Sequence, residues 1–199
     1  MAPMPTTRFL ALLRGINVGG NNKIPMAELR ALSGEIGWKN AQTYIQSGNL
    51  IFEAAGTSAA LEADLERAIE RRFGLSIEVL VRAGAAFPAY AMGNPFLEAS
   101  GTEANLVMLL LSKAPPRKEA AAELRMRAVN GERIVQVGDA VWIHYAGGVA
   151  RSKLSPALMD RLVGSTVTAR NWRTVLKLGE MVGNEATPGN APRGRSRAS

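Results

Sequence analysis

The side chains best suited to bind a ligand follow the first apolar stretch of the chain. Between Arg14 and Lys23 the sequence is rich in glycine and asparagine. Glycines let backbone N–H groups approach an anion, and the start of a following helix favours negative charge. The loop is not a Walker A loop, because Ile24 follows Lys23, and no G-x-G-x-x-G pattern is present. We expect a general anion or polar-ligand site; the alternative is a structural turn whose glycines supply positive φ. The candidate contacts are Arg14, Asn17, Gly19, Gly20, Asn22 and Lys23.

A second polar segment, Gln46-Ser47-Gly48-Asn49, lies between two short apolar stretches. Gln46, Ser47 and Asn49 are candidate ligand contacts. A tight hairpin needs residues such as Gly48 and Asn49 for its turn in any case, so the pattern favours a structural role. Ser47 has no neighbouring base in the sequence that would activate it as a nucleophile.

The most basic stretch before the C-terminus runs from 147 to 178, where Asp160 is the single acid. Glycine amides beside arginine and lysine would suit a phosphate, and Trp172 would suit stacking on a base. A solvated helix face with Trp172 as its apolar anchor explains the same residues equally well. The candidate contacts from this stretch are Arg151, Lys153, Arg170 and Arg173.

Several kinds of chemistry are excluded by residues that the chain lacks. It has no cysteine and a single histidine, His144. Disulfides, thiolate metal sites, Fe–S clusters and cysteine nucleophiles are therefore absent, and any metal would need oxygen ligands. His144 alternates with apolar residues of an expected strand and is interpreted as structural. We expect no metal and no cofactor, and the sequence assigns no catalytic residue and leaves enzymatic activity open.

The composition indicates a folded, soluble, cytoplasmic protein. The chain has 199 residues, of which 47% are hydrophobic, and a net charge of +7. The start has no apolar signal region, and the longest aliphatic run, 106–111, is far shorter than the ~20 residues of a membrane span. No membrane contact is expected. The positive charge favours an anionic partner, and part of it belongs to a Pro/Gly/Ser/Arg-rich tail, 186–199, which is expected to be disordered.

The spacing of apolar residues predicts the same element order twice, β-α-β-β-α-β. For the first unit we expect strands and helices at 8–13, 25–34, 41–46, 50–52, 58–73 (capped by Ser58) and 76–82, with a tight turn at 47–49. For the second we expect them at 105–111, 115–128, 133–137, 140–145, 155–163 and 166–169, followed by a terminal helix at 171–181.

This order is that of the ferredoxin-like split βαβ fold. We therefore predict an α+β protein of two subdomains, the first ferredoxin-like, with antiparallel sheets that carry helices on one face. The expected boundaries are 8–82 for the first subdomain, 83–103 for a linking helix and loop, and 104–182 for the second.

Five segments of the chain together resemble an uncharacterised bacterial family classed as a domain of unknown function. They are Leu12–Gly20 with Lys23–Met26, Tyr44–Asn49, Asn94–Phe96, Arg151–Leu154 and Arg170–Val175. The resemblance implies a two-subdomain α+β architecture with a ferredoxin-like half. It implies no activity, substrate or catalytic residue.

Three functions remain open from the sequence. We favour binding of an anionic small molecule, a phosphate-bearing metabolite or nucleotide, in a cleft between the subdomains, because the polar segments are loops that could converge there. A nucleic-acid or polyanion binding module is the first alternative, although neither 8–13, with only Phe9, nor 49–53, with only Phe52, resembles an RNA-recognition signature. Self-association through an open sheet edge is the second alternative. The sequence does not assign an oligomeric state.

Overall fold

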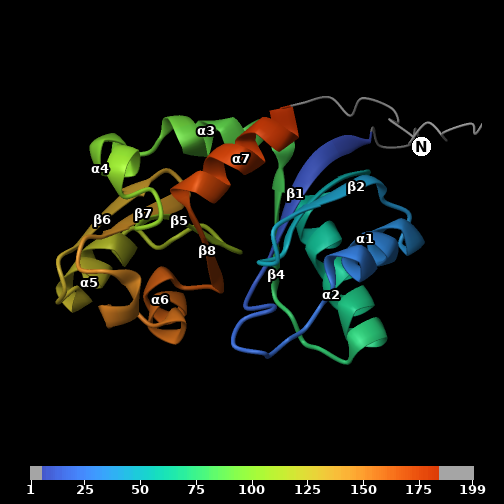
Figure 1. Ribbon diagram of the computed structural model, residues 1–199, viewed down its shortest axis with the longest axis horizontal. Coiled ribbons are helices and arrows are strands. Elements are labelled where there is room, and N and C mark those ends of the chain that lie inside the picture. Colours follow the sequence, from blue (N-terminus) through green and yellow to red (C-terminus); the bar gives the residue numbers. More distant parts are fainter. Residues whose placement is uncertain (1–5, 184–199) are drawn as a thin grey trace, which may run out of the picture.

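Two four-stranded antiparallel sheets form the framework of the computed structural model, which describes residues 6–183 (Figure 1). The basic tail expected at 186–199 lies outside the described residues. The first sheet contains β1 (Thr7–Leu13), β2 (Lys39–Tyr44), β3 (Asn49–Ala54) and β4 (Val79–Ala83) in the order β2-β3-β1-β4. The second contains β5 (Val107–Ser112), β6 (Glu132–Val137), β7 (Ala140–Tyr145) and β8 (Val167–Asn171) in the order β6-β7-β5-β8. Both subdomains thus have the same strand order, and the predicted α+β class with two β-α-β-β-α-β units is confirmed.

One face of each sheet carries a pair of helices, as predicted. Helices α1 (Met26–Glu35) and α2 (Ser58–Phe73) cover the first sheet, and α5 (Ala120–Arg127) and α6 (Pro156–Val163) cover the second. The remaining helices, α3 (Phe87–Met92), α4 (Leu97–Thr102) and α7 (Trp172–Gly183), belong to the linker and the C-terminal part of the described chain, and single 3₁₀ turns lie at Gly84–Ala86 and Val149–Arg151.

The other faces of the two sheets share one apolar core, because successive strand residues point to opposite faces. Leu10 and Leu12 of β1 point into this core from the first sheet, and Leu109 of β5 and Trp142 of β7 point into it from the second. Helix α7 adds Trp172, Val175, Leu178 and Val182, and its Trp172 ring meets the Trp142 ring edge-on at 5.8 Å. Figure 1 shows α7 and α3 lying across the top of the space between the two sheets. The subdomains are therefore joined by a common hydrophobic interior.

The structure corrects several details of the predicted elements. Thr57, and not Ser58, caps α2, accepting a hydrogen bond from the Ala60 amide at 3.3 Å. The first hairpin has a four-residue turn, 45–48, because Tyr44 already pairs with Asn49, which is the first residue of β3. Helix α5 begins only at Ala120, and α4 was not predicted as a separate helix.

Candidate functional site

The glycine-rich loop after β1 is a small hairpin with a two-residue turn. Val18 and Asn21 pair across it, and the Asn21 amide donates to the Val18 carbonyl at 3.0 Å. Gly19 and Gly20, the two turn residues, have φ of 58° and 83°. Positive φ at both positions is the requirement of a type I′ turn, which glycine meets without strain. The structural explanation of these two glycines is therefore sufficient.

Asparagine side chains fasten this hairpin to its surroundings. The Asn17 side-chain amide donates to the carbonyls of Ile24 and Gln46, at 3.0 and 2.9 Å, and its oxygen accepts from the Ile24 amide at 2.9 Å. The Asn22 amide donates to the Gly15 carbonyl at 3.1 Å. Both donors of Asn17 are thus used, one on Ile24 just after the loop and the other on Gln46 in the turn between β2 and β3. Asn17 and Asn22 hold positive φ themselves, at 56° and 49°, a conformation that asparagine tolerates better than most residues.

Arg170 lies buried between the two subdomains, and its guanidinium is fully used. Its Nε donates to Asn49 Oδ1 at 2.5 Å, and its Nη1 donates to Thr168 Oγ1 and the Ala169 carbonyl. Its Nη2 donates to three carbonyls of the first subdomain, those of Leu13, Ser47 and Gly48. Burial lowers the pKa of Arg170 to about 10, so the side chain stays charged at neutral pH. Arg170 has no donor left for a ligand and acts as a structural clamp.

Asn49 and its turn complete this clamp. The Asn49 side chain is fully buried, and its amide donates to the Tyr44 carbonyl and to Ser47 Oγ, at 2.9 and 3.1 Å. Gly48 packs so closely that an added Cβ would lie 2.7 Å from both Ile16 Cδ1 and Leu13 Cβ. Asn49 and Ser47 therefore serve the hairpin and the subdomain junction. The interpretation of this segment as a structural turn agrees with its geometry.

A groove of about 480 Å³ opens between the subdomains beside the hairpin; we call it the junction groove. The first subdomain contributes Arg14, Gly15, Val18, Asn21 and Asn22 to its walls. The second contributes Leu110, Pro156, Met159, Val167, Thr168 and Ala169. Of the residues expected to contact a ligand, the groove brings together Arg14 and Asn22.

Arg14 is positioned by an ion pair with Asp160 of α6. Its Nη1 lies 3.0 and 2.8 Å from the two carboxylate oxygens, and Asp160 Oδ1 also accepts from the Val167 amide at 2.9 Å. Within residues 6–183, Nη1 makes all the hydrogen bonds and ion pairs of the Arg14 side chain. Nε and Nη2, which form the bidentate edge of a guanidinium, remain for a ligand.

The hairpin separates four other expected ligand contacts from this groove: Asn17, Gly20, Lys23 and Gln46. A second depression, of about 400 Å³, is lined by Asn17, Gly20, Lys23, Pro25 and Gln46. Gly19 is exposed at the turn itself. The loop therefore forms a wall between two hollows, with Arg14 on one side and Lys23 on the other.

The basic residues of the second subdomain do not join either hollow. Arg151 and Lys153 are exposed next to the start of α6, whereas Arg173 is exposed on α7. These helices lie at opposite ends of β8 (Figure 1). Between the first two, the Ser152 hydroxyl donates to the Glu132 carboxylate. Although burial acts to raise the pKa of Glu132, this bond and the Asn130 amide bring it below its usual value.

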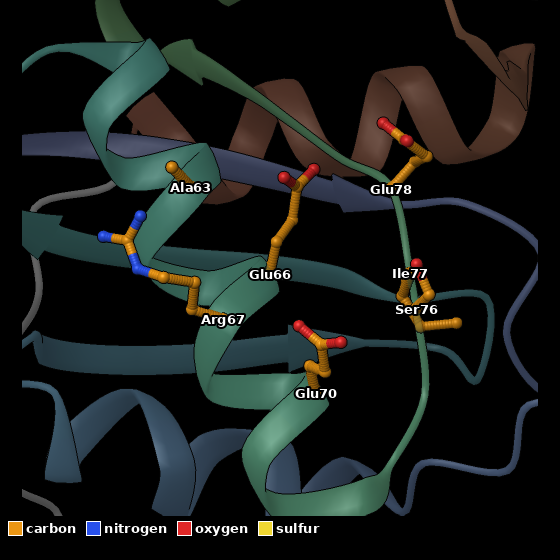
Figure 2. A pocket seen from close by; sticks show the side chains of 7 residues that line it. All are labelled: Ala63, Glu66, Arg67, Glu70, Ser76, Ile77 and Glu78. Atoms are coloured by element: carbon orange, nitrogen blue, oxygen red, sulfur yellow. The ribbon is translucent and has the colours of Figure 1, made fainter.

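An acidic hollow on the first subdomain is shown in Figure 2, where Glu66 and Glu70 of α2 face Glu78 at the start of β4. Arg67 of α2 also lines it, and Lys113 of the second subdomain offsets a further part of its negative charge. Lys113 Nζ lies 2.5 Å from Glu66 and 2.8 Å from Glu78. Within residues 6–183 no group of three or more acidic or histidine side chains is arranged to hold a metal ion.

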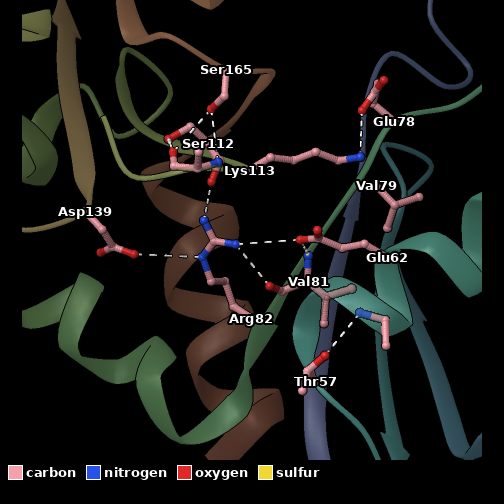
Figure 3. A network of polar contacts seen from close by, with 12 residues as sticks. Thr57, Glu62, Glu78, Val79, Val81, Arg82, Ser112, Lys113, Asp139 and Ser165 are labelled. Carbon is pink, nitrogen blue, oxygen red and sulfur yellow. Dashed lines mark hydrogen bonds and ion pairs between the residues drawn. The ribbon is translucent and has the colours of Figure 1, made fainter. Parts of the chain in front are cut away.

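The same side of the junction carries a second set of polar links (Figure 3). Arg82 of β4 donates to the Ser112 carbonyl and lies 3.9 Å from both Glu62 and Asp139. Burial is the main cause that raises the pKa of Glu62. These contacts reach from the first sheet to β5 and to the β6–β7 turn, so they hold the subdomains together away from the groove.

His144 lies on the face of β7 that points into the shared core, together with Trp142. It is buried, and its Nε2 lies 2.7 Å from the Glu103 carboxylate. Its position at the core agrees with the structural role expected for it.

The sequence did not indicate the second wall of the junction groove. In the sequence, Asp160 is only the single acid of a basic stretch, and Met159 and Thr168 fall within an expected helix and strand. The Arg14–Asp160 contact spans 146 positions, and such a contact leaves no local pattern in one sequence.

Comparison with known proteins shows the family of this chain. The model of the family described as "Protein of unknown function (DUF1697)" matches residues 6–142. The chain belongs to this family. The solved structure of conserved bacterial protein SP0830 from Streptococcus pneumoniae is similar to it, with a TM-score of 0.70 and 24% sequence identity over 89% of this chain and 99% of that one. That likeness supports the fold. A search of the curated proteins gives no match.

No helix within residues 6–183 is long and apolar enough to cross a membrane. The family description and the structural neighbour carry no activity. Function must therefore be argued from the geometry of the junction.

Proposed function

We propose that this protein binds an anionic small molecule in the junction groove. Phosphate-bearing metabolites and nucleotides are the ligands expected from the sequence, and small carboxylates fall in the same class. The observation that carries the proposal is the pattern of hydrogen bonds that Arg14 makes. Asp160 holds Nη1 of this side chain and leaves its Nε–Nη2 edge without a partner in the described part of the chain, and Arg14 lines a groove between two subdomains. Pockets between subdomains, with a few oriented polar groups, are common binding sites.

The polar groups around Arg14 support this proposal. The Asn22 side-chain amide donates to the Gly15 carbonyl, and within residues 6–183 its Oδ1 accepts no hydrogen bond. Thr168 Oγ1 accepts from Arg170, which leaves the hydroxyl hydrogen as a donor. Arg170 and Asn49 fix the end of β1 immediately before Arg14. A rigid support of this kind reduces the entropy lost when a ligand orders its site.

The proposal is tested by calorimetric titration with inorganic phosphate, AMP and short-chain carboxylates. At least one of these anions should bind, and Ala169→Asp should weaken it about tenfold by placing a like charge in the groove. Ala169 is exposed, so this variant should fold. Ala169→Asn is its matched neutral control. Absence of binding by every anion, or equal affinities of the Asp and Asn variants, would overturn the proposal.

The two other functions considered for this chain have less support. A polyanion needs a continuous basic surface, but the exposed cations of α6 and α7 lie at opposite ends of β8 (Figure 1). Pairing through a sheet edge needs free backbone groups. On β4, the Val79 and Val81 amides already donate to Glu66 and Glu62 at 2.8 Å, and on β2 a register shift interrupts the ladder between Lys39 and Gln42.

A further inference from the structure

The charges of the junction groove narrow the class of anion that it suits. Arg14 brings one positive charge, and Asp160, 2.8 Å away, brings one negative charge. Lys23 lies on the other side of the hairpin, in the second depression. A phosphate monoester carries close to two negative charges at neutral pH, and its sites usually gather several cations. The groove, with its arginine already paired, offers too little positive charge for such a group.

The geometry of Arg14 suits a carboxylate. Asp160 occupies Nη1 with both of its oxygens. The remaining donors, Nε–H and Nη2–H, are parallel, and their spacing matches the two oxygens of a planar carboxylate. A single negative charge on two oxygens would use both donors and would meet less repulsion from Asp160 than a dianion would.

Apart from Arg14, Asn21, Asn22 and Thr168, the side chains that line the groove are apolar. Leu110, Met159 and Val167 come from the core of the second subdomain, and Pro156 and Ala169 lie beside them. On the opposite wall, Val18 keeps 64% of its surface exposed at the hairpin. An exposed valine facing an apolar wall gains free energy when a hydrocarbon group covers both.

We infer that the ligand of the junction groove is a monocarboxylate with an apolar body, whose carboxylate binds the Nε–Nη2 edge of Arg14 and whose body lies between Val18 and Met159. This inference rests on the proposed function, because it names the substrate class of the same groove. It departs from the phosphate-bearing ligands expected from the sequence, because the groove offers too little positive charge for a phosphate monoester.

The test is a titration of the full-length ¹⁵N-labelled protein with four probes of related shape. Hexanoate carries both expected features, hexyl phosphate has the same body with a dianionic head, hexanamide has a neutral head, and acetate has no body. Hexanoate should bind about tenfold more tightly than each of the others. Its shift changes should fall on residues 14–22 and 156–169. Arg14→Gln should abolish this binding, whereas Arg173→Gln, a change at an exposed residue of α7, should leave it intact.

Each other result has a defined meaning. If hexyl phosphate binds as tightly as hexanoate, the monocarboxylate inference is overturned while the proposed anion site stands. If hexanamide binds as tightly as hexanoate, or if hexanoate does not bind, the monocarboxylate inference is overturned; the proposed anion site falls as well only if inorganic phosphate and AMP also fail to bind. Because Arg14→Gln also breaks the pair with Asp160, Val18→Asp serves as a second variant at the exposed hairpin; unchanged hexanoate affinity in it would overturn the placement of the apolar body.

Discussion

Arg170 Nε and Asn49 Oδ1 lie 2.5 Å apart, although 121 positions separate the two residues in the chain. This bond joins β8 of the second subdomain to the start of β3 in the first. Both partners are buried. The same guanidinium donates to the Leu13 carbonyl. The path of the chain into Arg14 therefore depends on a residue that lies 157 positions away in the sequence.

Replacement of Arg170 should be strongly destabilising. Arg170→Met would take this donor from Asn49 Oδ1 and from the Leu13 carbonyl, both in buried contacts, and the free energy of unfolding should fall by about 3–5 kcal/mol. Urea denaturation followed by circular dichroism measures the change. Arg173→Met, at an exposed position, should change it by less than about 0.5 kcal/mol. A loss of under about 1 kcal/mol for Arg170→Met would show that the clamp is unimportant.

Two glycine substitutions should separate backbone strain from steric overlap. Gly20→Ala adds a methyl group to a positive-φ residue in open space, and the same change at Gly48, with φ of 76°, adds it 2.7 Å from Ile16 and Leu13. Gly20→Ala should cost about 1 kcal/mol, and Gly48→Ala should cost a further 1–3 kcal/mol, roughly, from overpacking. Thermal and urea unfolding of the two variants give the comparison. Equal losses would contradict the close packing of Gly48.

The Ser152–Glu132 contact should make stability depend on acid pH. The pKa of Glu132 is lowered in the folded protein even though burial acts to raise it, because Ser152 and backbone amides favour the carboxylate. Its contribution is therefore present above the unfolded pKa of about 4.3 and is lost as pH falls through the folded pKa. Ser152→Ala should cost about 1–2 kcal/mol at pH 7 and less at pH 3. A cost that is the same at both pH values would refute the link.

Tyr145 should make the protein sensitive to alkali. Burial is the larger cause that raises its pKa to about 12, and the charge of Glu132 adds to it. The unfolded chain ionises this phenol near its ordinary pKa of about 10, so stability should fall as pH rises from that value towards the folded one. Tyr145→Phe should remove this part of the alkaline loss. In an ultraviolet titration, the tyrosinate absorbance that appears at the highest pH should be absent from the variant. If that absorbance persists, its assignment to Tyr145 is wrong.

The sequence predicted the framework because its signals are local. Alternating Ile77, Val79 and Val81 indicated a strand, and the stripe of Leu61 and Leu65 indicated α2. The fold class followed from the repeated element order, and the family followed from the motifs. The short α4 has too few turns to show a period, and this is why it was missed.

Less of the candidate site was predictable, for a physical reason. The side chains of Arg14, Asn17 and Arg170 look equally available in a sequence. The structure, however, buries Arg170 and uses the amide of Asn17 on Ile24 and on the turn between β2 and β3. Whether a donor is free depends on partners far along the chain. Asp160, which decides how Arg14 can be used, could be found only in three dimensions.

The apolar core that the two sheets share has a consequence for how the molecule comes apart. A cut in the linker would give two halves, each with Leu10 and Leu12, or Leu109 and Trp142, on an uncovered sheet face. Neither half would be a self-sufficient folding unit, despite the repeated topology. Heating or denaturant should therefore melt the whole in one cooperative step, and the separated fragments should regain structure chiefly when mixed.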